Sequence, residues 1–255
     1  MFNIGDLVII ISDSNQFIYK IKEISDKVCL VGNSYRVIKY VDIGDIRHAS
    51  SEEINNEKKD IQKVYDKIIQ NNSNRHKKAI FGRVLHIDGD KEYLESCLGL
   101  YKEIGIYSEG IYIPEKEVYK QIEKIMLLIT PDIVVITGHD AFVGTDKTKV
   151  DNYENSEYFI KTIRAIRKHF GFDEVIIIAG ACESHFEALI ASGANFASSP
   201  KRINTHTYDP AVVAIKAATT SINKTIDFEN ILKYIENGKD AIGGIETKGK
   251  MRLLF

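Results

Sequence analysis

The sequence has 255 residues, of which 44% are hydrophobic and 27% are charged, and its net charge is −2 at neutral pH. This composition is typical of a globular protein with a hydrophobic core, and it excludes wholesale disorder. It also excludes the surplus of basic residues that would attract nucleic acid or an acidic membrane surface.

The cysteines and the chain start indicate the cellular compartment. Cys29, Cys97 and Cys182 are far apart and form no CxxC pair, so we expect free thiols in a reducing compartment. The start of the chain, MFNIGDLVIIISDS, lacks the basic region of a secretory signal. No stretch approaches the ~20 apolar residues of a membrane span. We therefore expect a soluble protein that does not act at a membrane and is made inside the cell.

The first fifty residues read as short strands. β-Branched and polar residues alternate in four runs, FNIGDLVIII, QFIYKIKEI, KVCLVG and YRVIKYVDI, which turn residues separate. Short strands joined by tight turns predict a small SH3-like β-barrel over residues 1–50. Cys29 lies on one of these strands, where we expect it to fill the core.

A helix and a polar linker are predicted over residues 51–78. Ser50 followed by Glu53 has the pattern of a capping box. Apolar residues then recur at helical spacing, namely Ile54, Ile61, Val64, Tyr65, Ile68 and Ile69. The stretch NNSNRHKK (residues 71–78) is polar and basic, which predicts an exposed linker at a domain boundary.

From residue 79 to residue 255, apolar strands alternate with amphipathic helices. Strands are predicted in AIFGRVLHIDG, GIYI, DIVVIT, EVIIIAG and NFASS, with an edge strand near the C-terminus. Helices are predicted in DKEYLESCLGLYKEIG, PEKEVYKQIEKIMLLI, SEYFIKTIRAIRKHF, ESHFEALIASG, DPAVVAIKAATTS and DFENILKYIENG. Continuous apolar strands separated by helices indicate an α/β domain with a mostly parallel sheet covered on both faces. Right-handed crossovers then make it a doubly wound sheet.

Polar side chains follow three of these strands. Asp88 and Asp90 follow the first, His139 and Asp140 the third, and Cys182 the fourth. Because ligands bind beyond the carboxyl ends of parallel strands, and consecutive strands are often neighbours, we expect His139 and Cys182 over one crevice. An imidazole can hold a thiol as the thiolate. The N-terminus of the helix ESHFEALIASG, expected directly after Cys182, would add to this effect.

A thiolate beside an imidazole is suited to acyl transfer. Gly138, Gly180 and Ala181 are small, so a substrate chain could approach closely. Backbone N–H groups of Gly138 and Cys182 are candidates for an oxyanion hole. A cysteine or a histidine alone at such a place is more often structural. The pair, each member after an apolar strand and beside small residues, favours catalysis.

Two hydrophobic blocks, one ending at Gly138-His139 and the other at Ala181-Cys182, resemble the caspase–legumain–gingipain type of cysteine peptidase. The tetrapeptide Ala-Cys-Glu-Ser is similar to the nucleophile segment of legumains. Those enzymes have the order His-Gly, whereas this chain has Gly-His, which leaves the oxyanion donor on that side open.

Nearly the whole chain is similar to the YabG family of sporulation-specific proteases, through the N-terminal barrel and the motifs VVITGHDA, GACESHFEALIASGANFASSP and INTHTYDPA. The resemblance implies a caspase/flavodoxin-like sheet domain in which His139 and Cys182 are catalytic. It also implies a cysteine endopeptidase that cleaves spore coat and cortex proteins, with cleavage after arginine. Such an enzyme would work in the cytoplasm of the sporulating mother cell and associate with the spore coat. We expect no cofactor and no metal, because the sequence has no HExxH motif and no paired Cys/His spacing.

An arginine preference would need a carboxylate in the substrate pocket, because guanidinium and carboxylate pair in bidentate geometry. Asp140, Asp151 and Asp209 are candidates by their position near the strand ends. The alternative for each is a helix cap or a loop turn, and Asp209 before Pro210 has the pattern of an N-cap.

Exposed loops also predict self-cleavage, because nicking concentrates at loop tips. The predicted positions are Arg75 in the polar linker, or Arg47 or Arg83. An active preparation would then cut itself at one of these positions.

Two other interpretations stay open. Cys182 could belong to a nucleophile elbow of the glutamine-amidotransferase type, in which the partner histidine follows in sequence and would be His206. His185 is the other histidine nearby, and we expect it to face outward. The chain could instead be a non-enzymatic spore scaffold that binds coat proteins, with Asp88 and Asp90 as polar anchors.

Overall fold

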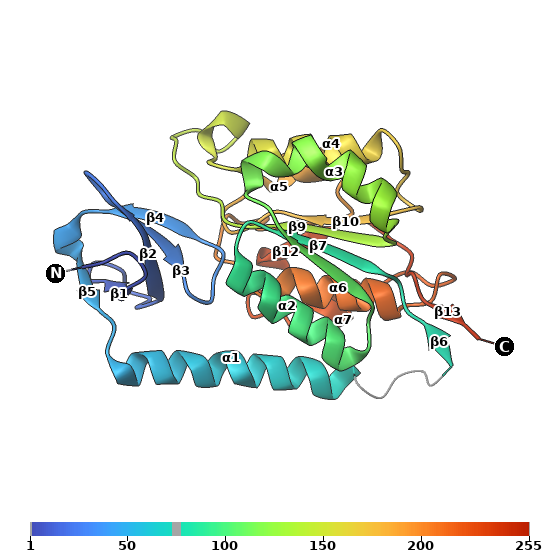
Figure 1. Cartoon of the computed structure of the whole chain (residues 1–255), viewed down its shortest axis with the longest axis horizontal. Coiled ribbons are helices and arrows are strands. Elements are labelled where there is room, and N and C mark those ends of the chain that lie inside the picture. Colours follow the sequence, from blue (N-terminus) through green and yellow to red (C-terminus); the bar gives the residue numbers. More distant parts are fainter. Residues whose placement is uncertain (1, 73–77, 255) are drawn as a thin grey trace.

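The N-terminal part of the chain is an antiparallel sheet. The computed structural model describes residues 2–72 and 78–254. The sheet, drawn in blue in Figure 1, has the strand order β4-β3-β2-β1-β5. Its strands are β1 (Leu7–Ile10), β2 (Ile18–Ile24), β3 (Val28–Gly32), β4 (Ile38–Val41) and β5 (Ile46–His48). Cys29 is 8% exposed on β3, which confirms that it fills the core.

Two details of this sheet differ from the prediction. The strand β5 has no counterpart among the predicted runs, and β4 is shorter than the run YRVIKYVDI. The first residues of that run leave the sheet, because Tyr35 forms a bridge to His206 and Val37 forms one to Asp140. A segment between β3 and β4 therefore lies against the second part of the chain.

The helix α1 (Ser51–Asn72) begins where the capping box predicts. The N–H of Glu53 donates to the Ser50 hydroxyl, and the N–H of Ser50 donates to the Glu53 carboxylate. Its apolar side chains pack against the core of the second part, namely Ile61, Val64, Tyr65, Ile68 and Ile69. The predicted linker falls largely on residues 73–77, outside the described residues, and the division of the chain at residues 50 and 78 stays a prediction.

The second part is built on a six-stranded sheet with the order β12-β11-β10-β9-β7-β8. Its strands are β7 (Val84–Asp88), β8 (Ser108–Tyr112), β9 (Ile133–Thr137), β10 (Ile176–Ala179), β11 (Phe196–Ser198) and β12 (Ile242–Gly244). All neighbouring strands are parallel except β12, which runs antiparallel to β11. The predicted mostly parallel α/β sheet is confirmed.

Helices cover both faces of this sheet (Figure 1). One face carries α3 (Glu115–Ile129), α4 (Ser156–Arg167) and α5 (Phe186–Ala191). The other face carries α2 (Lys91–Ile104), α6 (Asp209–Thr219) and α7 (Phe228–Leu232). Short 3₁₀ turns lie at Ile43–Asp45, Val150–Asn152 and Gly238–Asp240.

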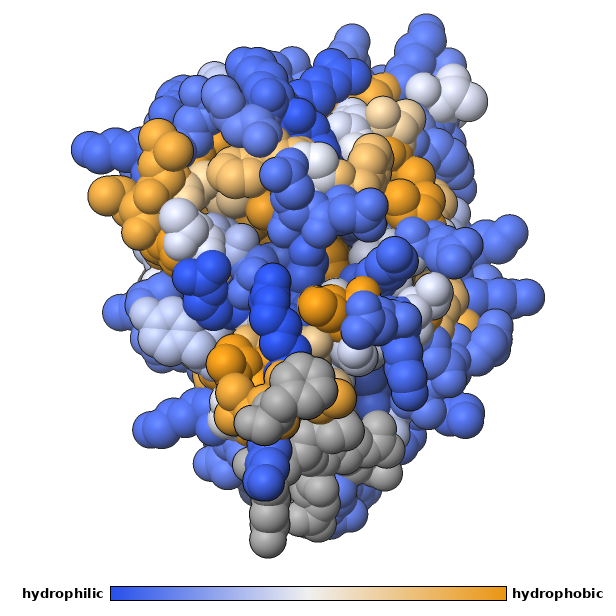
Figure 2. Space-filling view, turned by 90° about the vertical axis from the view of Figure 1, so that its right-hand side faces the viewer, coloured by the Kyte–Doolittle hydropathy of each residue, from blue (hydrophilic) through white to orange (hydrophobic). Residues whose placement is uncertain are grey.

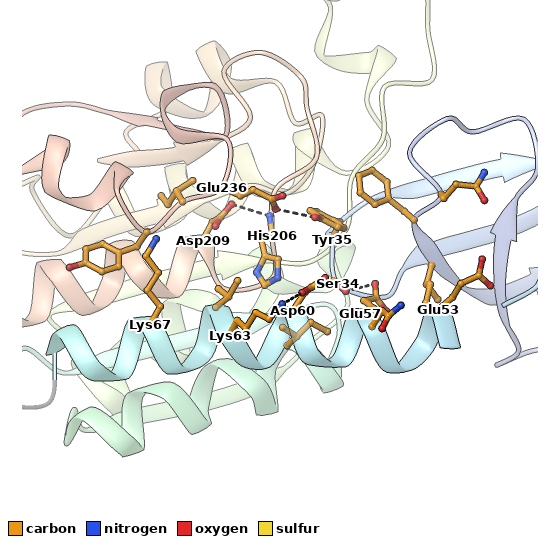
Figure 3. A pocket seen from close by; sticks show the side chains of 18 of the residues that line it. Ser34, Tyr35, Glu53, Glu57, Asp60, Lys63, Lys67, His206, Asp209 and Glu236 are labelled. Carbon is orange, nitrogen blue, oxygen red and sulfur yellow. Dashed lines mark hydrogen bonds and ion pairs between the residues drawn. The ribbon is translucent and has the colours of Figure 1, made fainter. Parts of the chain in front are cut away.

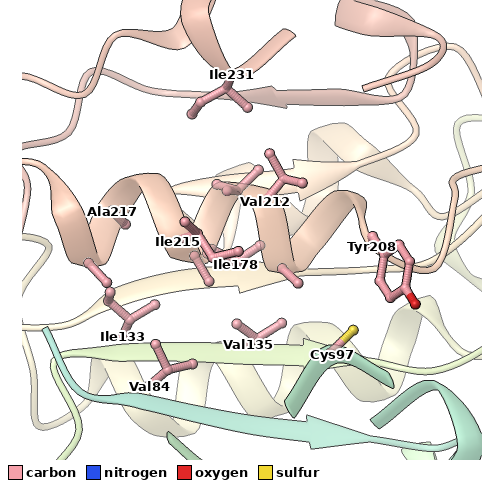
Figure 4. Close-up of a cluster of buried hydrophobic side chains, with 14 of the residues drawn as sticks. Val84, Cys97, Ile133, Val135, Ile178, Tyr208, Val212, Ile215, Ala217 and Ile231 are labelled. Atoms are coloured by element: carbon pink, nitrogen blue, oxygen red, sulfur yellow. The ribbon is translucent and has the colours of Figure 1, made fainter. Parts of the chain in front are cut away.

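Side chains alternate between the two faces along each strand, as a pleated sheet requires. Val135 and Ile178 point to the layer of α6, where Figure 4 shows them beneath Val212 and Ile215. Val134, between two residues of that face, belongs to the opposite core cluster. Full burial of each such side chain stabilises the fold by about 1.5–3 kcal/mol, so the two layers hold the strand ends in fixed positions.

The end of the molecule away from the N-terminal sheet faces the viewer in Figure 2 and is mainly hydrophilic, with separate apolar groups. A two-stranded pair, β6 (Ala79–Ile80) and β13 (Arg252–Leu253), lies at this end. Across residues 2–72 and 78–254, none of the helices is long and apolar enough to span a membrane.

The capping box predicts a measurable loss of stability. Ser50→Ala removes the hydroxyl that accepts from the Glu53 N–H, so the free energy of unfolding should fall by about 1 kcal/mol in urea titrations. Ser51→Ala, the matched control, changes an exposed residue inside the helix and should change stability little. Equal stability of the two variants would contradict a role for this cap.

Candidate active site

The carboxyl ends of β7, β9 and β10 meet at the edge of the sheet that faces the N-terminal sheet (Figure 1). From β7 the chain passes to β8 on one side and then returns to β9 on the other side. A doubly wound sheet binds its ligands at such a reversal point. The neighbouring positions of β9 and β10 confirm the expected placement of the strand ends that precede His139 and Cys182.

His139 is held from several directions and is 1% exposed. Its Nε2 lies 3.0 Å from Oδ2 of Asp90, and its backbone N–H donates to the carboxylate of Glu115 over 2.8 Å. Its ring packs beside that of Tyr93, with 5.3 Å between the centroids. Within the described part of the chain, its buried Nδ1 has no hydrogen-bond partner. This nitrogen is therefore the one that can exchange a proton with a reacting group.

Asp90 has two roles at once. One oxygen accepts from the N–H groups of Glu92 and Tyr93 and so caps helix α2, while the other faces His139. Burial alone would raise the pKa of Asp90, but the hydrogen bond and charge of His139 hold it below its ordinary value. Sequence analysis placed Asp90 at the strand end without this role. The position of Asp90, between a strand and the start of a helix, was the sequence signal that could have indicated this role.

The glycine at position 138 leaves room for the side chain of Glu115. A Cβ at this position would overlap the carboxylate of Glu115, the same group that holds the backbone of His139. The prediction of Gly138 as an oxyanion donor stays a prediction.

Cys182 lies in the turn after β10 and is completely buried. Its Sγ accepts a hydrogen bond from the N–H of Thr205 at 2.9 Å and lies 3.5 Å from the Thr205 carbonyl oxygen. Burial raises the pKa of the Cys182 thiol to about 12, although the Thr205 N–H opposes the shift. In this arrangement the sulfur is a neutral thiol.

The expected helix directly after Cys182 is wrong. The helix α5 begins only at Phe186, because Glu183 adopts a left-handed conformation with φ of 56° and His185 is the N-cap. The Ser184 hydroxyl accepts from the N–H of Ala181 and closes the turn. The sulfur therefore gains nothing from a helix N-terminus.

The N-terminal sheet covers the sulfur. Cys182 packs into the apolar cluster of that sheet, which includes Val37. Its backbone N–H donates to the carbonyl oxygen of Arg36 over 3.1 Å. The next residue, Val37, forms a bridge to Asp140, which follows His139. The peptide bond between Arg36 and Val37 is thus flanked by Cys182 on one side and the β9 end on the other.

Asp140 is a structural centre of this edge. Its carboxylate accepts four hydrogen bonds, from the N–H groups of Ala141 and Asn155 and from the hydroxyls of Ser156 and Ser184. Burial raises the pKa of Asp140 to about 6 against these donors. Its oxygens already have partners in the described structure, so they are poorly placed for a substrate guanidinium.

The other two candidate carboxylates lie in a turn and at the start of a helix. Asp151 is exposed in a 3₁₀ turn. Asp209 is the first residue of α6 and accepts from the N–H of His206. Burial raises the pKa of Asp209 to about 8 against that hydrogen bond. A pocket role for either stays a prediction.

His206 and His185 are both engaged elsewhere. Nδ1 of His206 accepts from the N–H of Tyr208, and burial, with the charge of Arg36, lowers the pKa of His206 to about 4. His185 was expected to face outward, which is wrong. It is 7% exposed, with Nε2 3.1 Å from the Thr148 carbonyl oxygen and Nδ1 toward the N–H of Ala188.

A pocket of about 750 Å³ lies between α1, the N-terminal sheet and the chain before α6. Figure 3 shows Ser34, Tyr35 and His206 on its wall, with Glu57 and Asp209 on opposite sides. Neither Cys182 nor His139 lines it. The pocket is therefore separate from the candidate pair, although Ser34 and Tyr35 on its wall directly precede Arg36, whose carbonyl oxygen contacts Cys182. Over the described residues, no group of three or more His, Cys, Asp or Glu is placed to hold a metal ion.

Comparisons with known proteins agree with the resemblance seen in the motifs. A family described as YabG peptidase U57 matches residues 3–255. The chain is 43% identical over 176 residues to the sporulation-specific protease YabG of Bacillus subtilis (strain 168), an alignment that covers 68% of this chain and 60% of that protein. The chain thus matches about three fifths of the length of this relative. None of the solved structures compared with the chain matches it. With nearly all of its residues matched by this one family, the chain belongs to the YabG peptidases.

Proposed function

We propose that the chain is a cysteine endopeptidase of sporulation that cleaves spore coat and cortex proteins after arginine, with Cys182 as nucleophile and His139 as general acid and base. The observation that carries the proposal is the peptide bond between Arg36 and Val37. Its carbonyl oxygen accepts a hydrogen bond from the N–H of Cys182, and Val37 forms a bridge to Asp140, the residue after His139. The name of the Bacillus relative, a sporulation-specific protease, supports the same class. A location in the mother-cell cytoplasm with later association to the spore coat belongs to this proposal.

The proposed mechanism uses the free nitrogen of His139. Nδ1 takes the proton of the Cys182 thiol, and the thiolate attacks the substrate carbonyl carbon. The N–H of Cys182 stabilises the resulting oxyanion, as it now binds a carbonyl oxygen. His139 then protonates the leaving amine, and water hydrolyses the thioester.

Asp90 supports this role by holding Nε2 of His139. An Nε2–H that donates to the Asp90 carboxylate leaves Nδ1 unprotonated and able to accept from the thiol. The Asp90–His139–Cys182 series is the general arrangement of an orienting group, a base and a nucleophile.

Finer features of the fold belong to the same proposal. We infer that the strand order of the main sheet is that of a caspase/flavodoxin-like domain, since the first parallel strand lies between the second and the third. The five N-terminal strands would be an SH3-like unit attached to it.

The amidotransferase alternative needs His206 as the base. The Nδ1 of His206 accepts from a backbone N–H, and its ring packs on Tyr35 with 5.7 Å between the centroids. These contacts favour His139 over His206. Activity that survives His139→Ala and is lost in His206→Ala would support the alternative.

Loss of either partner should abolish hydrolysis. We expect Cys182→Ala and His139→Ala each to lower the rate on fluorogenic Arg peptides by at least about 10³-fold, since each residue acts in every step. Peptides with Lys in place of Arg should be cleaved more slowly by the parent. His169→Ala, which changes an exposed histidine after α4, is the control and should keep the parental rate. Full activity in Cys182→Ala would refute the cysteine mechanism.

Asp90→Asn separates positioning from folding. Asparagine still caps α2, but its amide would donate to Nε2 of His139 and place the proton on Nδ1, so kcat should fall by about 10²–10⁴-fold. KM and the melting temperature should change little. Asp227→Asn, which alters the side-chain cap of α7, is the matched control and should leave kcat unchanged. A parental kcat in Asp90→Asn would exclude the orienting role.

Self-cleavage stays a prediction. Arg75 lies outside the described residues, Arg47 pairs with Glu53 at 2.7 Å, and Arg83 pairs with Asp132 at 3.2 Å. We expect clipping after these arginines in the wild type and none in Cys182→Ala. Intact-mass measurement over time distinguishes the two, and equal clipping in both would point to a contaminating protease.

A further inference from the structure

A segment of the N-terminal sheet crosses the candidate active site and inserts a charged side chain. Arg36, between β3 and β4, is 0% exposed and is the largest side chain that is fully buried among the described residues. Burial of a guanidinium costs several kcal/mol unless it is paired and hydrogen-bonded. The contacts that compensate this cost come from the second part of the chain.

The backbone of this segment pairs with the Thr205–Thr207 segment in the way that an extended peptide pairs with the edge of a strand. The N–H of Arg36 donates to the carbonyl oxygen of Thr205 over 3.1 Å, and the N–H of Thr207 donates to the carbonyl oxygen of Ser34 over 3.0 Å. Tyr35 forms an antiparallel bridge to His206 between them. Addition of an extended strand to an available backbone edge is a common mode of peptide recognition. The edge from Thr205 to Thr207 is the available one here.

The side chain of Arg36 fills a closed pocket. Its Nη1 lies 2.7 Å from Oδ2 of Asp88, and its Nη2 donates to the Thr207 carbonyl oxygen over 3.1 Å. Nη2 also lies 3.9 Å from Sγ of Cys97. The guanidinium carbon lies 5.1 Å from the ring centroid of Tyr93, within the range of a cation–π contact.

Asp88 is prepared to receive a cation. Its carboxylate accepts from the Thr137 hydroxyl over 2.8 Å and from the N–H of Asp90 over 2.9 Å, and it is 0% exposed. Burial would raise the pKa of Asp88, but the Arg36 guanidinium beside it holds the value well below the ordinary range. The site is thus a buried carboxylate at the carboxyl end of β7, beside the strand that leads to His139.

We propose that Asp88 is the carboxylate that recognises the substrate arginine, and that Arg36 occupies its pocket in the manner of a substrate, so that the N-terminal sheet blocks the active site. This inference rests on the proposed peptidase function and names its specificity pocket. It assigns to Asp88 the role that sequence position suggested for Asp140, Asp151 or Asp209.

The blocking segment is attached to the same chain, which gives it an advantage over any free substrate. An intramolecular ligand has an effective concentration on the order of millimolar. Free peptides therefore bind more weakly to the intact chain than to a chain whose blocking segment is displaced, and the intact chain cleaves them at a reduced rate.

Binding measured without chemistry tests this proposal. In a Cys182→Ala chain, Arg36→Ala empties the pocket, and the probe is the peptide acetyl-Ser-Tyr-Arg-amide, with a citrulline analogue as the neutral isostere. Calorimetry should show the arginine peptide binding at least about tenfold more tightly than the citrulline peptide, because only the former pairs with Asp88. A chain that retains Arg36 should bind the arginine peptide at least about tenfold more weakly.

The carboxylate itself is tested by Asp88→Asn, which should abolish the preference for arginine over citrulline. Asp151→Asn, which changes an exposed candidate carboxylate, is the matched control and should preserve it. Equal affinity for the two peptides with Asp88 present, or equal affinity with and without Arg36, would overturn the proposal. Peptide binding does not require catalysis. If the chain prefers the arginine peptide over the citrulline peptide but hydrolyses no peptide, only the proposed peptidase function is rejected.

A second variant keeps Arg36 and every other pocket residue and moves only the backbone of the blocking segment. A methyl at Gly32 would overlap the carbonyl oxygen of Tyr35, so Gly32→Ala displaces the blocking segment and keeps every pocket residue. Alkylation of Cys182 by iodoacetamide, followed by peptide mapping, should be at least about tenfold faster than in the wild type, because the thiol becomes exposed. Gly44→Ala, where an added methyl meets no atom within 4 Å, is the control. The same slow rate in both variants would show that this segment does not cover the sulfur.

Discussion

A guanidinium and a carboxylate meet at the carboxyl edge of the main sheet, both completely buried. A buried ion pair adds little net stability, but removal of one partner costs about 3–5 kcal/mol because the other charge stays uncompensated. Arg36 belongs to the segment between β3 and β4 and Asp88 to the main sheet, so this ion pair joins the two parts of the chain. Under the proposed role of Asp88, a substrate cation would take the place of Arg36. An arginine of a substrate protein is such a cation.

The same segment governs the state of the proposed nucleophile, Cys182. The segment that carries Arg36 lies over Cys182, and burial raises the pKa of this thiol to about 12. A neutral, inaccessible sulfur does not react with water-borne electrophiles or with other thiols. Displacement of the segment would expose the sulfur, and the buried Nδ1 of His139 has no hydrogen-bond partner among the described residues.

Much of the main sheet could be predicted, because apolar strands and amphipathic helices have distinct periods. The alternation also explains why the run YRVIKYVDI was taken as one strand. An extended segment shows the same pattern whether it pairs within its own sheet or with a distant loop, so the departure of Tyr35 and Arg36 has no local signal. The prediction that a helix begins directly after Cys182 was wrong for a related reason. Glu183 takes a left-handed conformation that its residue type does not indicate.

The candidate pair was predicted from its strand ends, whereas the supporting residues were not. Position in the sequence shows that Asp140 is near the site, but it cannot show that four donors already surround its oxygens. Asp88 and Asp90 were visible at the end of β7 without distinct roles. Their roles depend on Arg36 and His139, which are 52 and 49 residues away in sequence.

Helix α2 carries a consequence for how such an enzyme can change. Its cap orients the imidazole, and its first two turns supply the tyrosine and the cysteine that surround the guanidinium. The proposed arginine recognition and the orientation of the proposed base therefore both depend on one helix. A mutation that moved α2 to change the residue preference would also move the cap that orients His139. New preferences should therefore arise more readily through the Thr205–Thr207 edge, which contacts Arg36 from outside α2.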